Sequence, residues 1–158
     1  MLQCALVVQS GPVPVTSESP QTQYELRGLR YRAEITSRGP MPGMRSEIHD
    51  IAIRAGFADR APYVAIAFTE LVANAQEHGD PPFHVEAWWD GRLVIEVSNH
   101  GPGIDGSALA RPEPPRADEV RGRGLWLVRN LVDVIDVRSG PERTVVRVEL
   151  SPEPHIGA

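Results

Sequence analysis

The sequence predicts an α+β fold, a sandwich in which one layer of helices covers one layer of β-sheet. Two segments with apolar residues at helical spacing follow one another, a β-hairpin signal comes after them, and a last helical segment precedes two strand-like segments. The expected order is therefore strand, two helices, hairpin, long loop, helix and two strands. This order does not correspond to regular βαβ units, and no internal repeat is evident.

The folded part is expected to begin after a leader with few apolar residues. Residues 9–23, QSGPVPVTSESPQTQ, are rich in Ser, Pro, Thr and Gln, which predicts a flexible segment. From Leu29 to Ile35 apolar and charged residues alternate, as in a half-buried strand. We expect a leader over 1–23, one domain over 24–151 and a tail over 152–158.

Two amphipathic helices are expected after this strand. The first has a stripe of apolar residues at Met44, Ile48, Ile51 and Ala55. Gly56 is available to stop it. The second has a longer apolar stripe, at Val64, Phe68, Leu71, Val72 and Ala75. We expect Asp59 to cap its start and Gly79 to end it.

A β-hairpin is expected next, because FHVEAWW and RLVIEV flank the turn pair Asp90-Gly91. The prolines at 81 and 82 should end the helical region before it. Residues 100–121 are rich in Pro and Gly with few apolar residues, which predicts a long, mobile loop. Loops of this length in a compact domain are often functional.

The last elements are a third helix and two strands. Leucine and valine recur at helical spacing from about Gly124 to Val134, so we expect a helix there. The segments VIDVRS and TVVRVEL alternate in the manner of strands and complete the sheet.

The composition is that of a soluble globular protein and excludes several classes of partner. Sixteen basic side chains, all arginine, and 21 acidic ones give a net charge of -5, which argues against general affinity for nucleic acid or anionic membranes. Cys4 is the only cysteine and cannot form an internal disulfide. The apolar start MLQCALVV lacks the basic leader of a signal peptide, so we expect a cytoplasmic protein.

One face of the second helix carries an unusual set of polar residues. Glu70, Asn74 and His78 are spaced by four, so they share a face beside the apolar stripe. Such a face could line a cleft, or it could simply be solvated.

Two glycine-containing segments add to this observation. VSNHGPGID (97–105) follows a strand, and RGRGLWLV (121–128) opens the third helix. Glycines at a helix start let phosphate oxygens approach the backbone N–H groups. Each segment alone is more often a turn or a helix entry, and neither has the spacing of a dinucleotide or Walker motif.

Taken in order, the three segments resemble the boxes of the ATP-binding Bergerat fold of the GHKL superfamily, which includes gyrase, histidine kinases and mismatch-repair ATPases. ELVANAQEHG is similar to the asparagine box, VSNHGPGI to the first glycine box, and GRGLWLV to the second. The resemblance covers about Ile35 to Leu150 and is greatest to the anti-sigma factor serine/threonine kinases, which consist of a histidine kinase-like ATPase domain. It implies a mixed sheet with three main helices.

The resemblance also implies roles in the asparagine box, which in this subgroup reads acid, three residues, Asn-Ala, then His and often Gly. Asn74 would place its side-chain oxygen on Mg²⁺. Glu70 would accept the proton of the attacking hydroxyl of serine or water. His78 would either support the phosphates or only cap the helix.

The glycine boxes are implied to enclose the ATP. Gly101, Gly103, Ile104 and the loop up to residue 121 would form a lid. Gly122, Gly124 and Leu125 would present backbone donors to the phosphates.

Two further residues are implied to lie by the adenine. Thr144 matches a threonine beside it, although the pattern by itself favours a plain strand threonine. Asn99 stands where the family has an aspartate that accepts a hydrogen bond from the adenine amino group. Its oxygen can still accept that bond, while its NH₂ could face a water or a neighbouring carbonyl. Losing the charge-assisted part costs on the order of 1 kcal/mol, roughly a fivefold weakening of ATP binding.

The expected function is that of an ATP-dependent serine protein kinase that regulates transcription by partner switching. The resemblance implies that it sequesters a sigma factor, phosphorylates a STAS-domain anti-anti-sigma protein and pairs as a homodimer. Arg45 falls where relatives have an arginine that contacts both partners, and it could also be a plain exposed arginine. Two alternatives stay open: a non-catalytic binding module with weakened or lost ATP use, and a small ATP hydrolase or histidine kinase fragment.

Overall fold

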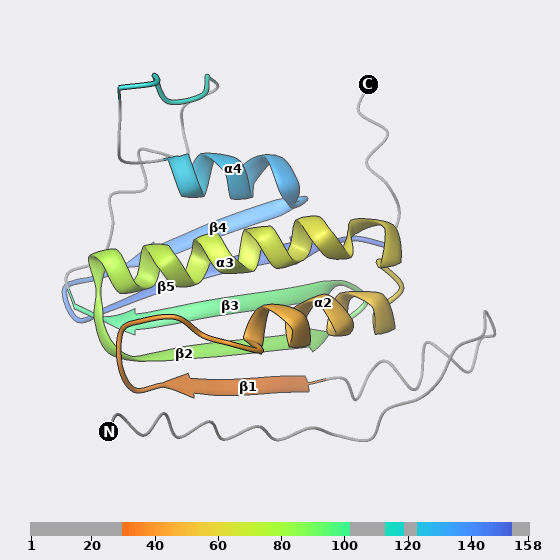
Figure 1. The fold of residues 1–158 in the computed structure, drawn as a ribbon, viewed down its shortest axis with the longest axis horizontal. Coiled ribbons are helices and arrows are strands. Elements are labelled where there is room, and N and C mark those ends of the chain that lie inside the picture. The colour runs from red at the N-terminus through yellow and green to blue at the C-terminus, as the bar shows by residue number, and fades with distance from the viewer. Residues whose placement is uncertain (1–29, 102–112, 119–122, 153–158) are drawn as a thin grey trace.

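The computed structural model describes residues 30–101, 113–118 and 123–152 (Figure 1). The elements in these ranges are β1 (Arg30–Ile35), α2 (Met44–Arg54), the 3₁₀ helix η1 (Ala58–Arg60), α3 (Ala61–His78), β2 (Asp80–Trp89), β3 (Leu93–His100), α4 (Arg123–Leu131), β4 (Val134–Ser139) and β5 (Arg143–Leu150). The predicted α+β class and the predicted order of elements are confirmed. The expected leader, most of the expected loop and nearly all of the expected tail lie outside the described residues.

The strands form one sheet in the order β1-β2-β3-β5-β4, and every neighbouring pair within it is antiparallel. Within the described residues the sheet is thus antiparallel throughout, where a mixed sheet was expected. Between β1 and β2 the chain reverses three times, on entering α2, α3 and β2, which makes these two strands antiparallel (Figure 1). A single helix makes β3 and β4 point the same way, but β5 lies between them and pairs with both.

The core lies between one face of this sheet and the helices. In Figure 1, α3 runs along the sheet, with α2 beside it on one side and α4 on the other. Alternate residues of the strands point into this core, as at Phe83, Val85 and Ala87 of β2, all 0% exposed. The buried stripes of α2 and α3 meet them, as the helical spacing predicted. None of the helices in the described ranges is long and apolar enough to cross a membrane.

The start of α3 differs from the prediction. Asp59 does not cap it, since it lies within η1 and the residue at the cap is Arg60, without a side-chain capping bond. The Arg60 guanidinium instead donates to both carboxylate oxygens of Asp133, at 3.1 and 3.0 Å. The predicted extent of the third helix is also too long: α4 ends at Leu131, because β4 begins at Val134.

Candidate functional site

The predicted polar face exists on α3. Glu70, Asn74 and His78 are each half-buried, whereas Leu71 and Ala75 on the neighbouring stripe are in the core. Within the described residues, neither the Glu70 carboxylate nor the Asn74 amide has a hydrogen-bonding or ionic partner. The two groups are thus partly shielded from water, and no described residue occupies their hydrogen-bonding capacity.

The start of α4 lies against Glu70. Gly124 is the second residue of α4, and a Cβ added to it would lie 2.8 Å from Glu70 Oε2. No side chain at position 124 fits without moving this carboxylate. Two segments that are far apart in the sequence therefore meet at Glu70, and the meeting depends on a glycine.

The other end of the polar face meets β3. Gly79 ends α3 as predicted, but its φ of -127° and ψ of -179° are those of extended backbone and not of a left-handed cap. A Cβ on Gly79 would lie 1.8 Å from Asn99 Nδ2 and 2.3 Å from Asn99 Cγ. Glycine is thus required here by the close approach of the Asn99 side chain.

Asn99 and Thr144 form a buried polar pair in the sheet. They are opposite each other on β3 and β5, and they are 4% and 1% exposed. Asn99 Nδ2 donates to the His100 carbonyl at 2.8 Å, and no described residue donates to Asn99 Oδ1, which can act as an acceptor. The Thr144 hydroxyl lies 3.1 Å from Ser139 Oγ. Both side chains point to the face of the sheet that the helices cover.

The two ends of this polar face suit the two ends of one elongated ligand. Glu70, Asn74 and Gly124 lie at one end, and Asn99 and Thr144 lie at the other. Glu70 and His78 are eight residues apart, which is about 12 Å along a helix. At one end, an amide and a carboxylate supply the oxygen atoms that Mg²⁺ prefers, and the N-terminus of α4 favours anions. At the other end, the buried Asn99 Oδ1 and the Thr144 hydroxyl can form hydrogen bonds with a nucleotide base. The residues present therefore fit a magnesium nucleoside triphosphate.

The first glycine segment is described only at its start. Gly101 has a φ of 105°, and its N–H donates to the Glu142 carbonyl at 3.1 Å, so the chain turns there in a left-handed conformation. Gly103, Ile104 and Gly122 lie outside the described residues. Leu125 is 4% exposed, so its side chain anchors α4 in the core while its backbone belongs to the first turn.

His78 lies at the end of α3, and Arg45 lies in the first turn of α2. His78 Nε2 lies 3.9 Å from Glu77 Oε2 in the last turn of α3. Arg45 is away from the nucleotide-like site, in the first turn of α2, where it is exposed. It lines a hollow of about 280 Å³ whose other walls are mainly apolar, formed by Gly39, Pro40, Met41, Phe68, Thr69, Val72, Ala73 and Gln76.

The opposite face of the sheet offers a second hollow of about 350 Å³, lined by His84, Glu86, Glu96, Ser98, His100 and Arg143. Its carboxylates are already paired. Glu86 lies 3.2 Å from Arg32, and Glu96 lies 3.6 Å from Arg147.

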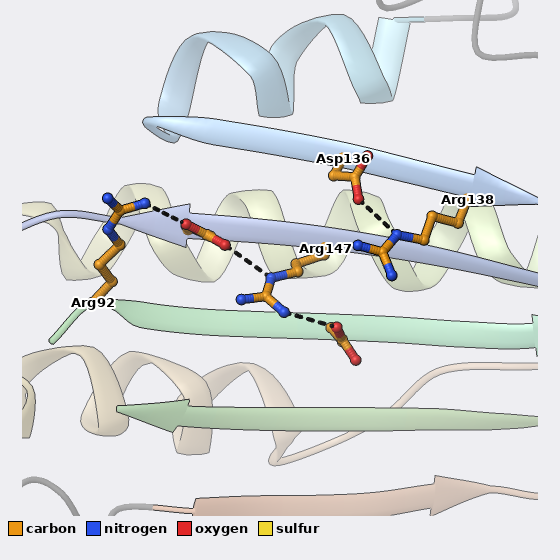
Figure 2. A network of polar contacts seen from close by, with 6 residues as sticks. Arg92, Asp136, Arg138 and Arg147 are labelled. Atoms are coloured by element: carbon orange, nitrogen blue, oxygen red, sulfur yellow. Dashed lines mark hydrogen bonds and ion pairs between the residues drawn. The ribbon is translucent and has the colours of Figure 1, made fainter. Parts of the chain in front are cut away.

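Figure 2 shows that the pairing continues across this face, where Arg147 and Arg92 both bind Glu149, at 2.9 and 2.8 Å. The hydrogen bond from Arg92, together with Arg147, lowers the pKa of Glu149 below its ordinary value. Charges that neutralise one another in this way leave little to attract a ligand, so the helix-covered face remains the better candidate.

The sequence analysis assigned no role to Arg38, which contacts the end of α3. Its Nε donates to the Gln76 carbonyl at 3.0 Å, and its Nη2 donates to the Gly79 carbonyl and to Asp80 Oδ1. The partners lie some forty positions away in the sequence, so no local pattern could have indicated these bonds.

A comparison with protein-family profiles matches residues 37–150 to the histidine kinase-like ATPase domain. This range contains α3, the Gly79–Asn99 contact, Thr144 and the start of α4. No curated protein matches the chain. Because the match covers most of the sequence and the fold has the two layers of the GHKL type, the chain belongs to the family of histidine kinase-like ATPase domains.

Proposed function

We propose that the protein is an ATP-dependent serine/threonine kinase of the anti-sigma type, which phosphorylates a STAS-domain anti-anti-sigma protein and sequesters a sigma factor. The observation that carries this proposal is the Glu70 carboxylate beside Gly124 at the start of α4. Transfer of a phosphoryl group to a hydroxyl requires a base close to the donors that bind the phosphates. Asn74, one turn from Glu70 on the same face, completes the arrangement.

The proposed mechanism uses groups of this chain at both ends of the ATP. Asn99 Oδ1 and the Thr144 hydroxyl would bind the adenine, and Asn74 Oδ1 would hold Mg²⁺, which when bound would offset the charge of the triphosphate. Glu70 accepts the proton of the partner's serine as the bond between serine oxygen and γ-phosphorus forms. The bond from γ-phosphorus to the β-phosphate oxygen breaks, and ADP leaves. The N–H groups at the start of α4 stabilise the charge on the phosphates.

The hollow around Arg45 is the proposed partner surface. Its apolar walls with one arginine suit a segment that offers an apolar side chain next to a carboxylate. Within the described ranges Arg45 has no ionic partner of its own. A sigma factor and an anti-anti-sigma protein that both use this arginine would compete for the kinase, which is what partner switching requires.

The catalytic test uses radiolabelled ATP and a STAS-domain partner. Glu70→Gln should reduce transfer by at least about 100-fold while leaving Mg-ATP binding in calorimetry intact, because the base acts only in the reaction. The matched control is Glu77→Gln, the same change on an exposed position of the same helix, which should transfer at the native rate. Native-like transfer by Glu70→Gln would exclude the assigned role.

The partner test is a pull-down with the sigma factor and the STAS protein. Arg45→Ala should weaken capture of both, whereas Arg54→Ala, an exposed arginine in the last turn of the same helix, should not. If Arg45→Ala captures both partners as well as the native chain does, the proposed surface is wrong.

The second candidate function is a non-catalytic binding module, and Asn99 favours it. The Asn99 amide donates to the His100 carbonyl and lacks the charge with which an acid would bind adenine. A native chain that binds the partners but transfers no phosphate, and gives no heat with millimolar Mg-ATP, would support the module over the kinase.

A further inference from the structure

We propose that Arg38 is a positioning residue of the nucleotide site, which fixes the end of α3 against the adenine-side residues of β3. This inference rests on the ATP site proposed above and extends it to a residue that does not touch the ligand. Arg38 lies in the segment after β1, outside the helix that it binds.

The guanidinium satisfies the end of α3 where the backbone does not. A helix leaves its last carbonyls without partners and carries a partial negative charge there, which a cation complements. The common solution is a glycine in the left-handed conformation. Gly79 is extended instead, with a φ of -127°, and its carbonyl and that of Gln76 accept hydrogen bonds from Arg38.

A second pair of bonds holds the same segment. The Gly39 N–H donates to Gln76 Oε1 at 2.9 Å, and Gln76 Nε2 donates back to the Gly39 carbonyl at 3.1 Å. We call Arg38, Gly39 and Gln76 the latch. Because Gln76 takes part through both its backbone and its side chain, the latch fixes the last turn of α3 in position as well as in orientation.

The latch ends at the adenine side of the site. Arg38 binds the carbonyl of Gly79, and Gly79 is the residue against which the Asn99 side chain packs without room for a Cβ. Arg38 also binds Asp80 Oδ1 at 3.0 Å, while Asp80 Oδ2 faces Gly101, where an added Cβ would lie 3.2 Å from it. Arg38 therefore acts on Asn99 and Gly101 through Gly79 and Asp80.

This placement predicts that loss of Arg38 weakens the binding of the adenine and leaves the binding of the phosphates unchanged. Glu70 and Asn74 lie earlier on α3, Glu70 by about 12 Å from the latched end. Loss of Arg38 should loosen the wall around Asn99 and leave the catalytic carboxylate in place. We expect Arg38→Ala to raise the KM for ATP about 10-fold, which corresponds to the loss of a charge-assisted hydrogen bond, with kcat within about twofold of native.

The experiment compares Mg-ATP with magnesium triphosphate, which has no base. By calorimetry, Arg38→Ala should lose about 10-fold in affinity for Mg-ATP and retain its affinity for magnesium triphosphate. Arg38→Lys keeps the charge but carries its donors on a single nitrogen and lacks the planar guanidinium that reaches the acceptors from Nε and Nη2, so its loss should be in the same direction and smaller. Arg54→Ala is the matched control, an exposed arginine outside the latch, and should bind both ligands like the native chain.

Two results would overturn the inference, and each is distinct from failure of the ATP site. Equal Mg-ATP affinity in Arg38→Ala and native protein excludes a positioning role. Equal losses for Mg-ATP and triphosphate, with a lower melting temperature, show a general structural role instead. If Arg38→Ala does not fold, Arg38→Lys decides by the same comparison. A native chain that binds triphosphate but not ATP would instead refute the proposed adenine site.

Discussion

The contact between Gly124 and Glu70 predicts a variant that loses activity without losing stability. In Gly124→Ala, the new Cβ would lie 2.8 Å from Glu70 Oε2, whereas ordinary contacts begin at 3.4 Å. The carboxylate must therefore retreat by about 0.6 Å, the difference between these two distances. It is the far end of a flexible side chain, so the movement costs little folding energy. Alanine is also a better helix former than glycine, by up to about 1 kcal/mol.

The same small movement is costly for catalysis. Misplacing a catalytic group by about 1 Å can cost on the order of 100-fold in rate. We therefore expect Gly124→Ala to transfer phosphate roughly 10- to 100-fold more slowly, with a melting temperature equal to or above that of the native chain. Transfer is measured with radiolabelled ATP at saturation, and stability by thermal unfolding.

The control is Gly140→Ala, which makes the same change where the new Cβ would meet only the Arg143 carbonyl at an ordinary 3.7 Å. It should transfer at the native rate. Native-rate transfer by Gly124→Ala would show that Glu70 is not the base or that its position does not matter. A large loss of stability would show that the carboxylate cannot move aside.

Three further predictions concern stability. In Gly79→Ala the new Cβ would lie 1.8 Å from Nδ2 of the buried Asn99 side chain. The free energy of unfolding in urea should therefore fall by at least about 2 kcal/mol, and Mg-ATP should bind more weakly in calorimetry. Arg60→Ala removes the guanidinium from the 8% exposed carboxylate of Asp133, which keeps the bond from the Ser151 N–H, so urea unfolding should show a loss of about 2 kcal/mol. Burial, and then the hydrogen bond to Glu47, raise the pKa of Tyr31 well above its ordinary value, so the native state retains a proton that the unfolded state loses near pH 10. Stability should be unaffected by this group below pH 10 and fall above it by up to about 1.4 kcal/mol per pH unit; Tyr31→Phe should abolish this fall in alkaline unfolding curves.

The parts of the fold that the sequence predicted well are those with a local cause. The turn at Asp90-Gly91 needs only the residues of the hairpin, and Gly91 has the left-handed φ of 68° that such a turn requires. Gly56, with a φ of 90°, ends α2 for an equally local reason. The stripe of α3 follows from spacing alone, so the shared face of Glu70 and Asn74 was predictable.

The errors come from contacts between distant residues. Asp59 has the chemistry of a cap, but Arg60 occupies the cap position and its guanidinium pairs with Asp133 from the other end of the chain. The end of α3 at Gly79 was predicted correctly for the wrong reason, since the residue is glycine because Asn99 approaches it, not because its φ is positive. Neither contact has a signal in the nearby sequence.

The same distinction applies to the site. Spacing places two oxygen-bearing side chains on one helix face, but only the resemblance to known ATPases suggested that the second glycine segment meets them. The structure supplies the physical form of that meeting, which is the missing Cβ of Gly124. Neither the residue spacing nor the family resemblance indicated a role for Arg38, because its partners lie at the end of another element.

Asn99 is suited to its surroundings as well as to a ligand. A carboxylate at this 4% exposed position would lose the hydrogen bond to the His100 carbonyl and place a buried negative charge beside that carbonyl. Asp80, the residue after Gly79, has Arg38 to balance its charge, whereas no described arginine is bonded to the side chain at position 99. The amide thus removes an electrostatic cost from the free protein and gives up charge-assisted binding of adenine, worth on the order of 1 kcal/mol. The ATP affinity of this chain should accordingly depend more on the fit between Gly79 and Asn99, and therefore on the latch, than on charge.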